Sequence, residues 1–474
     1  MITTPVRSAA ARNDWRSLDP RPLGSPAHTP VSVSVVVPAH GCQPELDLTL
    51  AALAAQSHPA SLIGVVVVDD RSEPPLTLPD LRPENTELVR VEGGGHGSGR
   101  ARDIGARHAE GDVVLFLDAD IIADHHHLEA HARWHEITDD AVVLGFRDFV
   151  DVTGVTPAAT HDAVGRDTMA SLVDGREREP HSWIEQLLEK TDDLLHDRED
   201  LWRAVVGASV STRRDFYQEV GGFAHFPRRG IVDTEFGYRC FTGGGLIVPE
   251  RHARSLHQGQ RSFATRGPEI AQRRAPLIAN HIANPRYRTP IGGRQWAVPY
   301  VHVIVPPSTA PFMTARYTVD DILANDHDDL TVSVVVDPDG DDADLYADYW
   351  QADGRVRLVE QAPASGFPSP ATMIVPVGAR LTSTAVGSLL DRLRTWRQGL
   401  LSISVTGVDA PLEMWATRAL SRVRRADPAA ERPVRETARE LFGETWVAGS
   451  DHGVGTRSGA SDRHFKDGRF HAGR

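Results

Sequence analysis

Two aspartates follow a run of apolar residues in the stretch VVLFLDADII. Asp118 and Asp120 are separated by one residue, and apolar residues precede and follow them. Carboxylates at the end of a buried strand need a cation beside them, because burying an unpaired charge is costly. Hard oxygen ligands favour Mg²⁺ or Mn²⁺, and such ions commonly bridge phosphate groups. The spacing therefore predicts a divalent-metal site, with solvated acids in a turn as the alternative.

Polar residues elsewhere in the first half could complete such a site. Asp69 and Asp70 end the β-branched run LIGVVVVDD. Arg102 follows the glycine-rich stretch GGGHGSG, where its guanidinium could meet a diphosphate or serve as a surface cation. The glycine-rich stretch lacks the Lys and Ser/Thr of a phosphate-binding P-loop. The pattern therefore favours a phosphate-containing ligand but does not fix how it is bound.

Three further candidates lie between residues 230 and 260. Asp233 and Glu235 stand at an expected helix start in GIVDTEFGYR, where the helix dipole favours acids whether or not they are catalytic. His257, in SLHQG, is a candidate metal ligand, although a single histidine is more often structural. Only their position in a fold can decide between these roles.

The elements that must position these residues alternate between strand and helix. We expect strands within 31–41, 62–70, 86–95 and 112–120, and helices within 46–59 and 98–112. Continuous apolar strands separated by helices indicate an α/β fold with a parallel sheet covered on both faces. Ligands bind beyond the carboxyl ends of such strands. The acids at 69–70 and 118–120 should therefore face one crevice.

The second half of the chain repeats the strand pattern of the first half but lacks the aspartates of its LDAD motif. Strand-like runs at 301–309 and 330–342 resemble those at 31–41 and 62–70, and VPVG at 375–378 stands where LDAD stood. This pattern predicts a second, smaller α/β domain, interpreted as a degenerate repeat that lost its chemistry. The stretch ANPRYRTPIGGRQW at 284–296 has the composition of a boundary. We expect a flexible arm over 1–30, a catalytic domain over 31–285, a non-catalytic domain over 298–448 and a disordered tail over 449–474.

Composition limits which classes of binding partner and which cellular compartment we expect for this protein. The formal net charge of −14 argues against a nucleic-acid partner, which would need clustered Lys and Arg. Two cysteines cannot form a disulfide framework, so we expect a reducing, cytoplasmic location. No apolar run approaches the roughly 18 to 20 residues of a membrane-spanning helix. The basic stretch 411–428 could lie at the inner membrane face, but packing on the second domain explains it better.

Seven segments, taken in order, resemble the inverting glycosyltransferases of family 2, which have the GT-A fold. They are VSVVVPAHG, VVVVDDRS, GRARDIG, LDAD, VGASVST with VGGF, DTEFGYR and SLHQG, and they span residues 32–262. The segment LGFRDFVD adds a weaker resemblance to the bacterial chondroitin polymerase and polypeptide GalNAc-transferase type. The resemblance implies a Rossmann-like, mostly parallel sheet with helices on both faces.

The resemblance also implies a donor site for a nucleotide-sugar. Pro38 and Ala39 would line the nucleotide pocket, and Asp69 and Asp70 would contact uracil or ribose. Arg102 would approach the nucleotide.

The metal and the general base follow from the later motifs. Asp118 would contact the ribose or a metal-bound water, and Asp120 and His257 would bind Mn²⁺ or Mg²⁺. Asp233 matches the acidic pair that supplies the base, which deprotonates the acceptor hydroxyl. Val232 stands where the family usually has Glu, so Glu235 could share or take the base role.

The implied function is transfer of a sugar from a UDP-sugar to an acceptor that the sequence leaves open: a glycan, a peptide, a lipid-linked glycan or a metabolite. A non-catalytic scaffold that binds nucleotide-sugar or glycan is the alternative, supported by the degenerate second half. A nucleotidyltransferase is a second alternative, but PAHGCQPELD offers it no Lys or Arg. The second half could bind acceptor, cover the site or form a homodimer.

Overall fold

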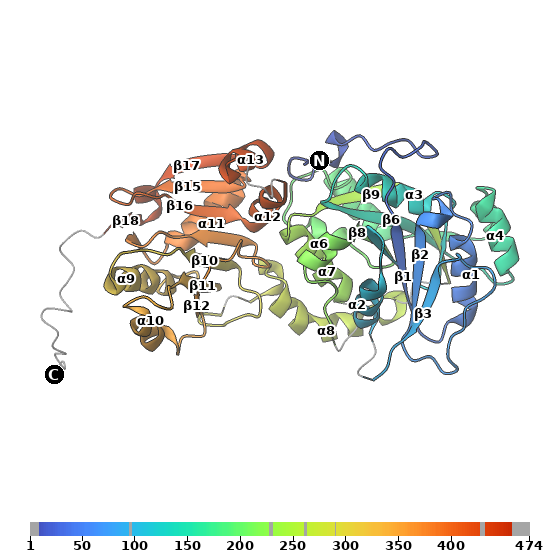
Figure 1. Ribbon diagram of the computed structural model, residues 1–474, viewed down its shortest axis with the longest axis horizontal. Coiled ribbons are helices and arrows are strands. Elements are labelled where there is room, and N and C mark those ends of the chain that lie inside the picture. The colour runs from blue at the N-terminus through green and yellow to red at the C-terminus, as the bar shows by residue number, and fades with distance from the viewer. Residues whose placement is uncertain are drawn as a thin grey trace, which may run out of the picture. The chain divides into compact units, whose positions relative to one another are not determined.

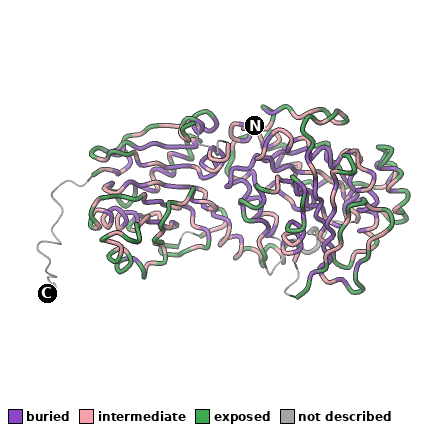
Figure 2. The backbone as a smooth tube through the Cα atoms, viewed as in Figure 1, coloured by how far each residue is buried: buried purple, intermediate pink, exposed green. Residues whose placement is uncertain are grey.

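The chain divides into two compact units, Met1–Ile282 and Ala283–Arg474. The computed structural model describes residues 9–93, 97–226, 231–259, 263–289, 291–426 and 432–456. Unit 1 and unit 2 each have their own sheet, and the strands of both are largely buried (Figures 1 and 2).

Unit 1 has a nine-stranded sheet in the order β3-β2-β1-β4-β8-β6-β9-β5, with β7 paired to β6. Its strands are β1 (Val33–Ala39), β2 (Ile63–Asp69), β3 (Thr86–Arg90), β4 (Val113–Leu117), β5 (Ile121–Ala123), β6 (Ala141–Val150), β7 (Arg178–Pro180), β8 (Ser209–Arg213) and β9 (Leu246–Gln258). Its α-helices are α1 (Gln43–Leu53), α2 (Ser98–His108), α3 (His127–His135), α4 (Pro157–Gly165), α5 (Ser182–Thr191), α6 (Arg214–Glu219), α7 (Val232–Thr242) and α8 (Phe263–His281). Short 3₁₀ helices include η1 (Trp15–Ser17) and η4 (Leu201–Ala204).

The predicted α/β class is confirmed, with helices on both faces of the sheet. Consecutive valines of β1 face opposite ways: Val35 shares a core cluster with Leu50 of α1, whereas Val36 faces Gly105 of α2. In Figure 1, α1 and α2 accordingly flank β1 and β2. β1, β2, β3 and β4 pair in parallel, and so do β6 and β9, whereas β8 pairs antiparallel with both β4 and β6. The prediction of a mostly parallel sheet is confirmed.

The strand register brings the acidic strand ends to one edge of the sheet. Ala39, the last residue of β1, pairs with Asp69, the last residue of β2. β4 runs parallel on the other side of β1 and ends at Leu117, directly before Asp118. Parallel strands end at the same edge, so the acids after β2 and β4 lie on either side of the end of β1.

Unit 2 has a seven-stranded sheet in the order β12-β11-β10-β13-β16-β15-β17 and a two-stranded sheet of β14 and β18. The strands are β10 (Val301–Val305), β11 (Leu330–Val335), β12 (Val356–Val359), β13 (Ala371–Ile374), β14 (Ala379–Leu381), β15 (Leu400–Ser404), β16 (Leu412–Ala416), β17 (Glu444–Ala448) and β18 (Val454–Thr456). The helices are α9 (Phe312–Leu323), α10 (Ala343–Trp350), α11 (Ala385–Trp396), α12 (Thr417–Ala426) and α13 (Val434–Leu441).

The topology of unit 2 repeats that of unit 1. β10 pairs in parallel with β11 and β13, β16 is antiparallel to β13 and β15, and β15 is parallel to β17. β1, β2, β4, β8, β6 and β9 pair in the same pattern. Ile304 pairs with Ile374 as Val36 pairs with Phe116, so Pro376 and Gly378 occupy the places of the two metal-motif aspartates. This agrees with the interpretation of unit 2 as a degenerate repeat.

The basic stretch 411–428 packs within unit 2 as far as the structure describes it. It forms β16 and then α12, in which Leu420 and Val423 are buried. No helix in the described part of the chain is long and apolar enough to cross a bilayer.

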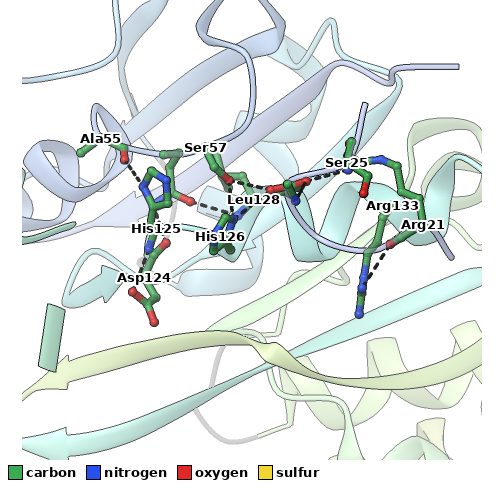
Figure 3. A network of polar contacts seen from close by, with 12 residues as sticks. Arg21, Ser25, Ala55, Ser57, Asp124, His125, His126, Leu128 and Arg133 are labelled. Atoms are coloured by element: carbon green, nitrogen blue, oxygen red, sulfur yellow. Dashed lines mark hydrogen bonds and ion pairs between the residues drawn. The ribbon is translucent and has the colours of Figure 1, made fainter. Parts of the chain in front are cut away.

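The prediction of a flexible arm is wrong for residues 9–30, which pack on unit 1. The Asn13 side chain is fully buried and donates to the carbonyl oxygens of Leu194 and Ile247, each at 2.9 Å. Arg21 contacts Glu129 at 2.6 Å and Glu136 at 3.0 Å, and Figure 3 shows it beside Ser25 and Arg133. The composition of the arm suggested flexibility, but its polar side chains satisfy buried polar groups of the sheet and of α3. Residues 1–8 lie outside the described residues.

The predicted disordered tail is also partly wrong. Residues 449–456 form a 3₁₀ turn, η6 (Gly449–His452), and β18, which pairs with β14. The rest of that tail, 457–474, lies outside the described residues.

Replacing Arg21 by Ala is expected to destabilise unit 1 by about 3 kcal/mol, because removing one partner of a buried ion pair leaves a buried charge. The carboxylates of Glu129 and Glu136 are only 6% and 7% exposed. Urea unfolding measures the loss. Arg16→Ala is the matched control: its side chain is 47% exposed, so its ion pairs should contribute at most about 1 kcal/mol. If both variants lost the same small free energy of unfolding, the conclusion that residues 9–30 pack on unit 1 would be wrong.

Candidate active site in unit 1

Asp69 and Asp70 shape the loops around the ends of β1 and β2. Asp69 accepts hydrogen bonds from the backbone N–H groups of Ser72 at 2.7 Å and Leu76 at 3.2 Å. Burial would raise the pKa of Asp69, but the hydrogen bonds from Ser72 outweigh it and leave this pKa below its ordinary value. Asp70 accepts from the N–H of Gly97, directly before α2. Both acids therefore organise the loops at this edge of the sheet.

Arg102 joins the DxD motif to the candidate base. Its guanidinium donates to Asp118 at 2.6 Å and to Asp233 at 2.8 Å. The arginine side chain is 3% exposed, whereas the two carboxylates are each about one third exposed. The guanidinium also lies 5.2 Å from the ring centre of Phe223. The structure places the charge of Arg102 between two carboxylates. Its approach to a nucleotide stays a prediction.

Asp120 and His257 form a second pair beside the first. β5 pairs with β9 so that Ile121 lies opposite His257, which leaves Asp120 Oδ2 3.4 Å from His257 Nε2. Burial and the neighbouring charge of Asp118 raise the pKa of Asp120 to about 7. Burial, followed by the charge of Arg147, lowers the pKa of His257 to about 4. The environment thus disfavours the charged form of each residue in the absence of a cation.

The donor set fits a divalent cation that takes its remaining ligands from substrate. Asp120 Oδ1 and His257 Nδ1 are buried without a hydrogen-bond partner, so no described group of the protein offsets the cost of burying these two polar atoms. Within the described ranges, no group of three or more His, Cys, Asp or Glu side chains is arranged to hold a metal ion. Two protein ligands suit an ion such as Mg²⁺, which commonly takes one or two carboxylates plus substrate phosphates.

Glu235 is placed differently from Asp233, although both lie in the first turn of α7. Its carboxylate is 4% exposed and accepts from Arg239 Nη2 at 2.7 Å. The same guanidinium donates to the carbonyl oxygens of Val220 and Gly222, after α6. Glu235 thus anchors α7, and a buried carboxylate held by a guanidinium is poorly placed to take a proton from substrate.

The sequence did not single out Gly207, which leaves room for the ion pairs that Arg102 makes with Asp118 and Asp233. A Cβ atom at this position would lie 2.5 Å from Asp233 Oδ1 and 2.6 Å from Arg102 Cζ. Real Cβ atoms do not approach other atoms this closely, so any side chain at this position would displace the Asp233 carboxylate and the Arg102 guanidinium. The signal was a glycine within the apolar stretch VVGASV, which indicates close approach of another group.

Gly207→Ala is therefore expected to displace the guanidinium and Asp233 together, at a cost of about 1–3 kcal/mol for overpacking. Any activity that depends on Asp233 should fall with it. Thermal unfolding and turnover of the same preparation measure both effects. Gly165→Ala is the control, because a Cβ there meets only Ala55, at 3.8 Å. Normal turnover in Gly207→Ala would contradict the arrangement of the Arg102 pairs.

The site thus contains two adjoining clusters at one end of the sheet: Arg102 with Asp118 and Asp233, and Asp120 with His257. Asp118 belongs to the Arg102 pairs and is two residues from Asp120, so the DxD motif connects the candidate base to the candidate metal ligands. Pro38 and Ala39 lie at the end of β1, next to Asp69 in the register. Of the predicted residues, Glu235 alone is held in a separate buried ion pair.

Comparison with known proteins confirms the family resemblance. Residues 34–163 match the family model described as Glycosyl transferase family 2. Similar curated proteins include a hyaluronan synthase of Pasteurella multocida, 25% identical over 279 residues, covering 54% of this chain and 28% of that protein. A chondroitin synthase of Pasteurella multocida strain Pm70 is 26% identical over 259 residues, covering 52% and 26%. The chain thus spans little more than a quarter of the length of these relatives.

Solved structures of glycosyltransferases are also similar. One is the mannosyltransferase PcManGT from Pyrobaculum calidifontis in complex with GDP-Man and Mn²⁺, with a TM-score of 0.35 and 20% identity, covering 56% of this chain and 71% of that one. Another is residues 1–349 of TarS from S. aureus in complex with UDP-GlcNAc, with a TM-score of 0.37 and 18% identity, covering 54% and 69%.

Proposed function

We propose that unit 1, which contains the segment matching family 2 glycosyltransferases, transfers a sugar from a UDP-sugar to an acceptor hydroxyl with inversion at the anomeric carbon. The observation that carries this proposal is the position of Arg102. It holds Asp118 of the DxD motif and Asp233 of α7 on one guanidinium, although 115 residues (233 − 118) separate these acids in the chain. A candidate base thus lies beside candidate metal ligands.

Asp120 and His257 would hold the divalent ion, Mn²⁺ or Mg²⁺, which would neutralise charge on the departing nucleoside diphosphate. The buried, unpartnered atoms of both residues support this assignment. Asp118 would orient the ribose or a water beside Asp120 and His257. The hydrogen bond from Arg102 would fix the position of the Asp118 carboxylate.

Asp233 would act as the general base. It is about one third exposed, so an acceptor can reach it, and Arg102 fixes its orientation. As the acceptor oxygen forms its bond to the anomeric carbon, its proton would pass to Asp233 and the bond from that carbon to the diphosphate oxygen would break. Attack opposite the leaving group inverts the configuration. Both acids contact an arginine, but the side chain of Glu235 is only 5% exposed against 32% for Asp233, so an acceptor reaches Asp233 and not Glu235.

The ends of β1 and β2 would hold the nucleotide. Pro38 and Ala39 would form the floor of the pocket, and Asp69 and Asp70 would present the loops that they organise by hydrogen bonds. Unit 2 would be non-catalytic, because Pro376 and Gly378 replace the aspartates of the DxD motif.

Calorimetric titration with UDP and UMP, in Mn²⁺ and in EDTA, tests the donor site without knowledge of the acceptor. UDP should bind in Mn²⁺ and should lose at least about tenfold in affinity in EDTA, because the ion contacts both the protein and the diphosphate. UMP, which lacks the second phosphate, should bind more weakly. Tight binding of UDP that EDTA leaves unchanged would refute the metal site, and absence of nucleotide binding would refute the function.

A further inference from the structure

Arg147 of β6 lies in a row of side chains that ends at the candidate metal ligands. β6 and β9 pair in parallel, with Arg147 opposite Ser255 and Phe149 opposite His257. Residues two apart on a strand point to the same face of a sheet, so Arg147 and Phe149 share the face of His257. The guanidinium carbon of Arg147 lies 5.7 Å from the ring centre of Phe149, which lies 4.6 Å from that of His257. His257 Nε2 is in turn 3.4 Å from Asp120 Oδ2.

The strand register places Arg147 and the DxD motif on either side of the start of β8. β4 ends at Leu117, opposite Ser209, the first residue of β8, and the DxD motif follows. β6 pairs with the other edge of β8 as far as Leu144 and continues to Val150. β4 and β6 are both antiparallel to β8, so they run in the same direction, and the chain after each pairing continues past the start of β8. Arg147 therefore lies at the same edge of the sheet as the DxD motif, two strand spacings or about 10 Å along it.

The charge of Arg147 acts on both candidate metal ligands. Burial, followed by this charge, lowers the pKa of His257. Burial and the charge of Asp118 raise the pKa of Asp120, and the charge of Arg147 opposes that rise. A divalent ion held by Asp120 and His257 would therefore have a second cation beside it, and an anion in contact with both would offset their repulsion. The position of Arg147 thus suits an anionic part of a ligand that the ion also holds.

Unit 2 lacks this arginine as well as the aspartates of the DxD motif. In the repeated strand order β15 takes the place of β6, and Leu401 pairs in β15 as Val143 pairs in β6. The fourth residue after Val143 is Arg147, whereas the fourth residue after Leu401 is Val405, which is buried. The repeated fold therefore does not require a cation at this position. Loss of the arginine together with the acids is expected if all of them serve the same ligand.

The chemistry of the side chain favours an oxyanion as its ligand. A guanidinium stays charged and presents a planar fork of donors that matches phosphate and carboxylate oxygens. The donor of the proposed reaction offers two such groups: its β-phosphate and, where the sugar has one, a carboxylate. We propose that Arg147 binds an oxyanion of the nucleotide-sugar donor, which is either the β-phosphate or a carboxylate on the sugar. This rests on the proposed function of the same site.

Arg147→Gln tests the proposal, with Arg254→Gln as the matched control. Arg254 lies on β9 directly before Ser255, the partner of Arg147, so its side chain points to the opposite face, and it is exposed. Calorimetry in saturating Mn²⁺ measures the affinities for UDP, UDP-glucose and UDP-glucuronate. If the oxyanion is the β-phosphate, Arg147→Gln should bind all three at least about tenfold more weakly, the effect of one charge-assisted hydrogen bond. If it is a sugar carboxylate, only UDP-glucuronate should lose that affinity. Arg254→Gln should retain every affinity.

Mn²⁺ binding by the nucleotide-free protein separates a ligand contact from a structural role. Arg147→Gln removes a positive charge beside Asp120 and His257, so its Mn²⁺ affinity should be unchanged or higher. A variant that merely distorted the end of β6 would lose affinity for Mn²⁺ and for nucleotide together. Arg147→Lys keeps the charge without the fork of donors, so it should recover part of the lost nucleotide affinity.

The other outcomes each overturn the proposal. If the wild type binds the three ligands and Arg147→Gln binds each of them equally well, Arg147 contacts no oxyanion of the donor, while the proposed function stands. If Arg147→Gln loses affinity for Mn²⁺ as well as for nucleotide, the residue acts only through the structure of β6. If Arg254→Gln weakens binding as much as Arg147→Gln, the effect is one of overall surface charge. If the wild type binds none of the three ligands in Mn²⁺, the proposed function fails, and the assignment of Arg147 fails with it.

Discussion

Replacing Asp233 by Asn is expected to lower kcat for donor turnover by about 10²- to 10⁴-fold, the usual contribution of a general base. Asn has nearly the same shape but cannot take a proton at neutral pH. Arg102 keeps its other carboxylate partner, Asp118, so the site should stay assembled. The affinity for the UDP-sugar should therefore change little. Rapid-mixing measurement of UDP release, with water or an acceptor as nucleophile, separates the two quantities.

Glu235→Gln is the control for that experiment, because both acids lie in the first turn of α7. Weakening the buried contact with Arg239 should lower the midpoint of thermal unfolding. The folded fraction of this variant should turn over donor at close to the wild-type rate. If folded Glu235→Gln lost turnover while Asp233→Asn retained it, the base would be Glu235 and the assignment would be wrong.

Replacing Asp120 by Ala is expected to reduce donor turnover by about 10²-fold or more, because the divalent ion would lose one of its two protein ligands. Turnover by this variant should no longer respond to EDTA, and EDTA should bring the wild type down to a similar level. Measuring UDP release by both proteins across a Mn²⁺ titration tests this. Full Mn²⁺-dependent turnover by Asp120→Ala would contradict the assignment.

Stability in the absence of metal gives Asp120→Ala a second, independent readout. Burial and the charge of Asp118 disfavour the charged form of Asp120, as its raised pKa of about 7 shows. Removing such a carboxylate should leave the free energy of unfolding of metal-free protein at pH 8 unchanged or increased. A loss of activity with no loss of stability would separate a functional role from a structural one.

The sequence was most informative where each signal was local. The β-branched runs predicted β1, β2 and β4, and their parallel ends bring Asp69 and Asp118 to one edge of the sheet. The replacement of LDAD by VPVG predicted a degenerate repeat, and the matching strand order of unit 2 agrees with it. In both cases the pattern lies within a few consecutive residues.

Contacts between distant segments could not be predicted in the same way. Arg102 and Asp233 are 131 residues apart, so no local pattern reveals that one guanidinium contacts both Asp118 and Asp233. The arm at residues 9–30 looked flexible because its buried partners, such as Glu129, lie more than 100 residues away. Glu235 is different: Arg239 follows it by four residues on a helix, a spacing that itself predicts an ion pair.

The measurement that tests the central claim most directly is the release of nucleoside diphosphate by the wild-type chain from a panel of UDP- and GDP-sugars, in Mn²⁺, Mg²⁺ or EDTA. Slow hydrolysis of the donor would require no knowledge of the acceptor. We expect release from one or a few UDP-sugars, dependent on a divalent ion and abolished by EDTA. Absence of release from every donor, together with absence of calorimetric binding of UDP in Mn²⁺, would contradict the claim and favour a non-catalytic scaffold.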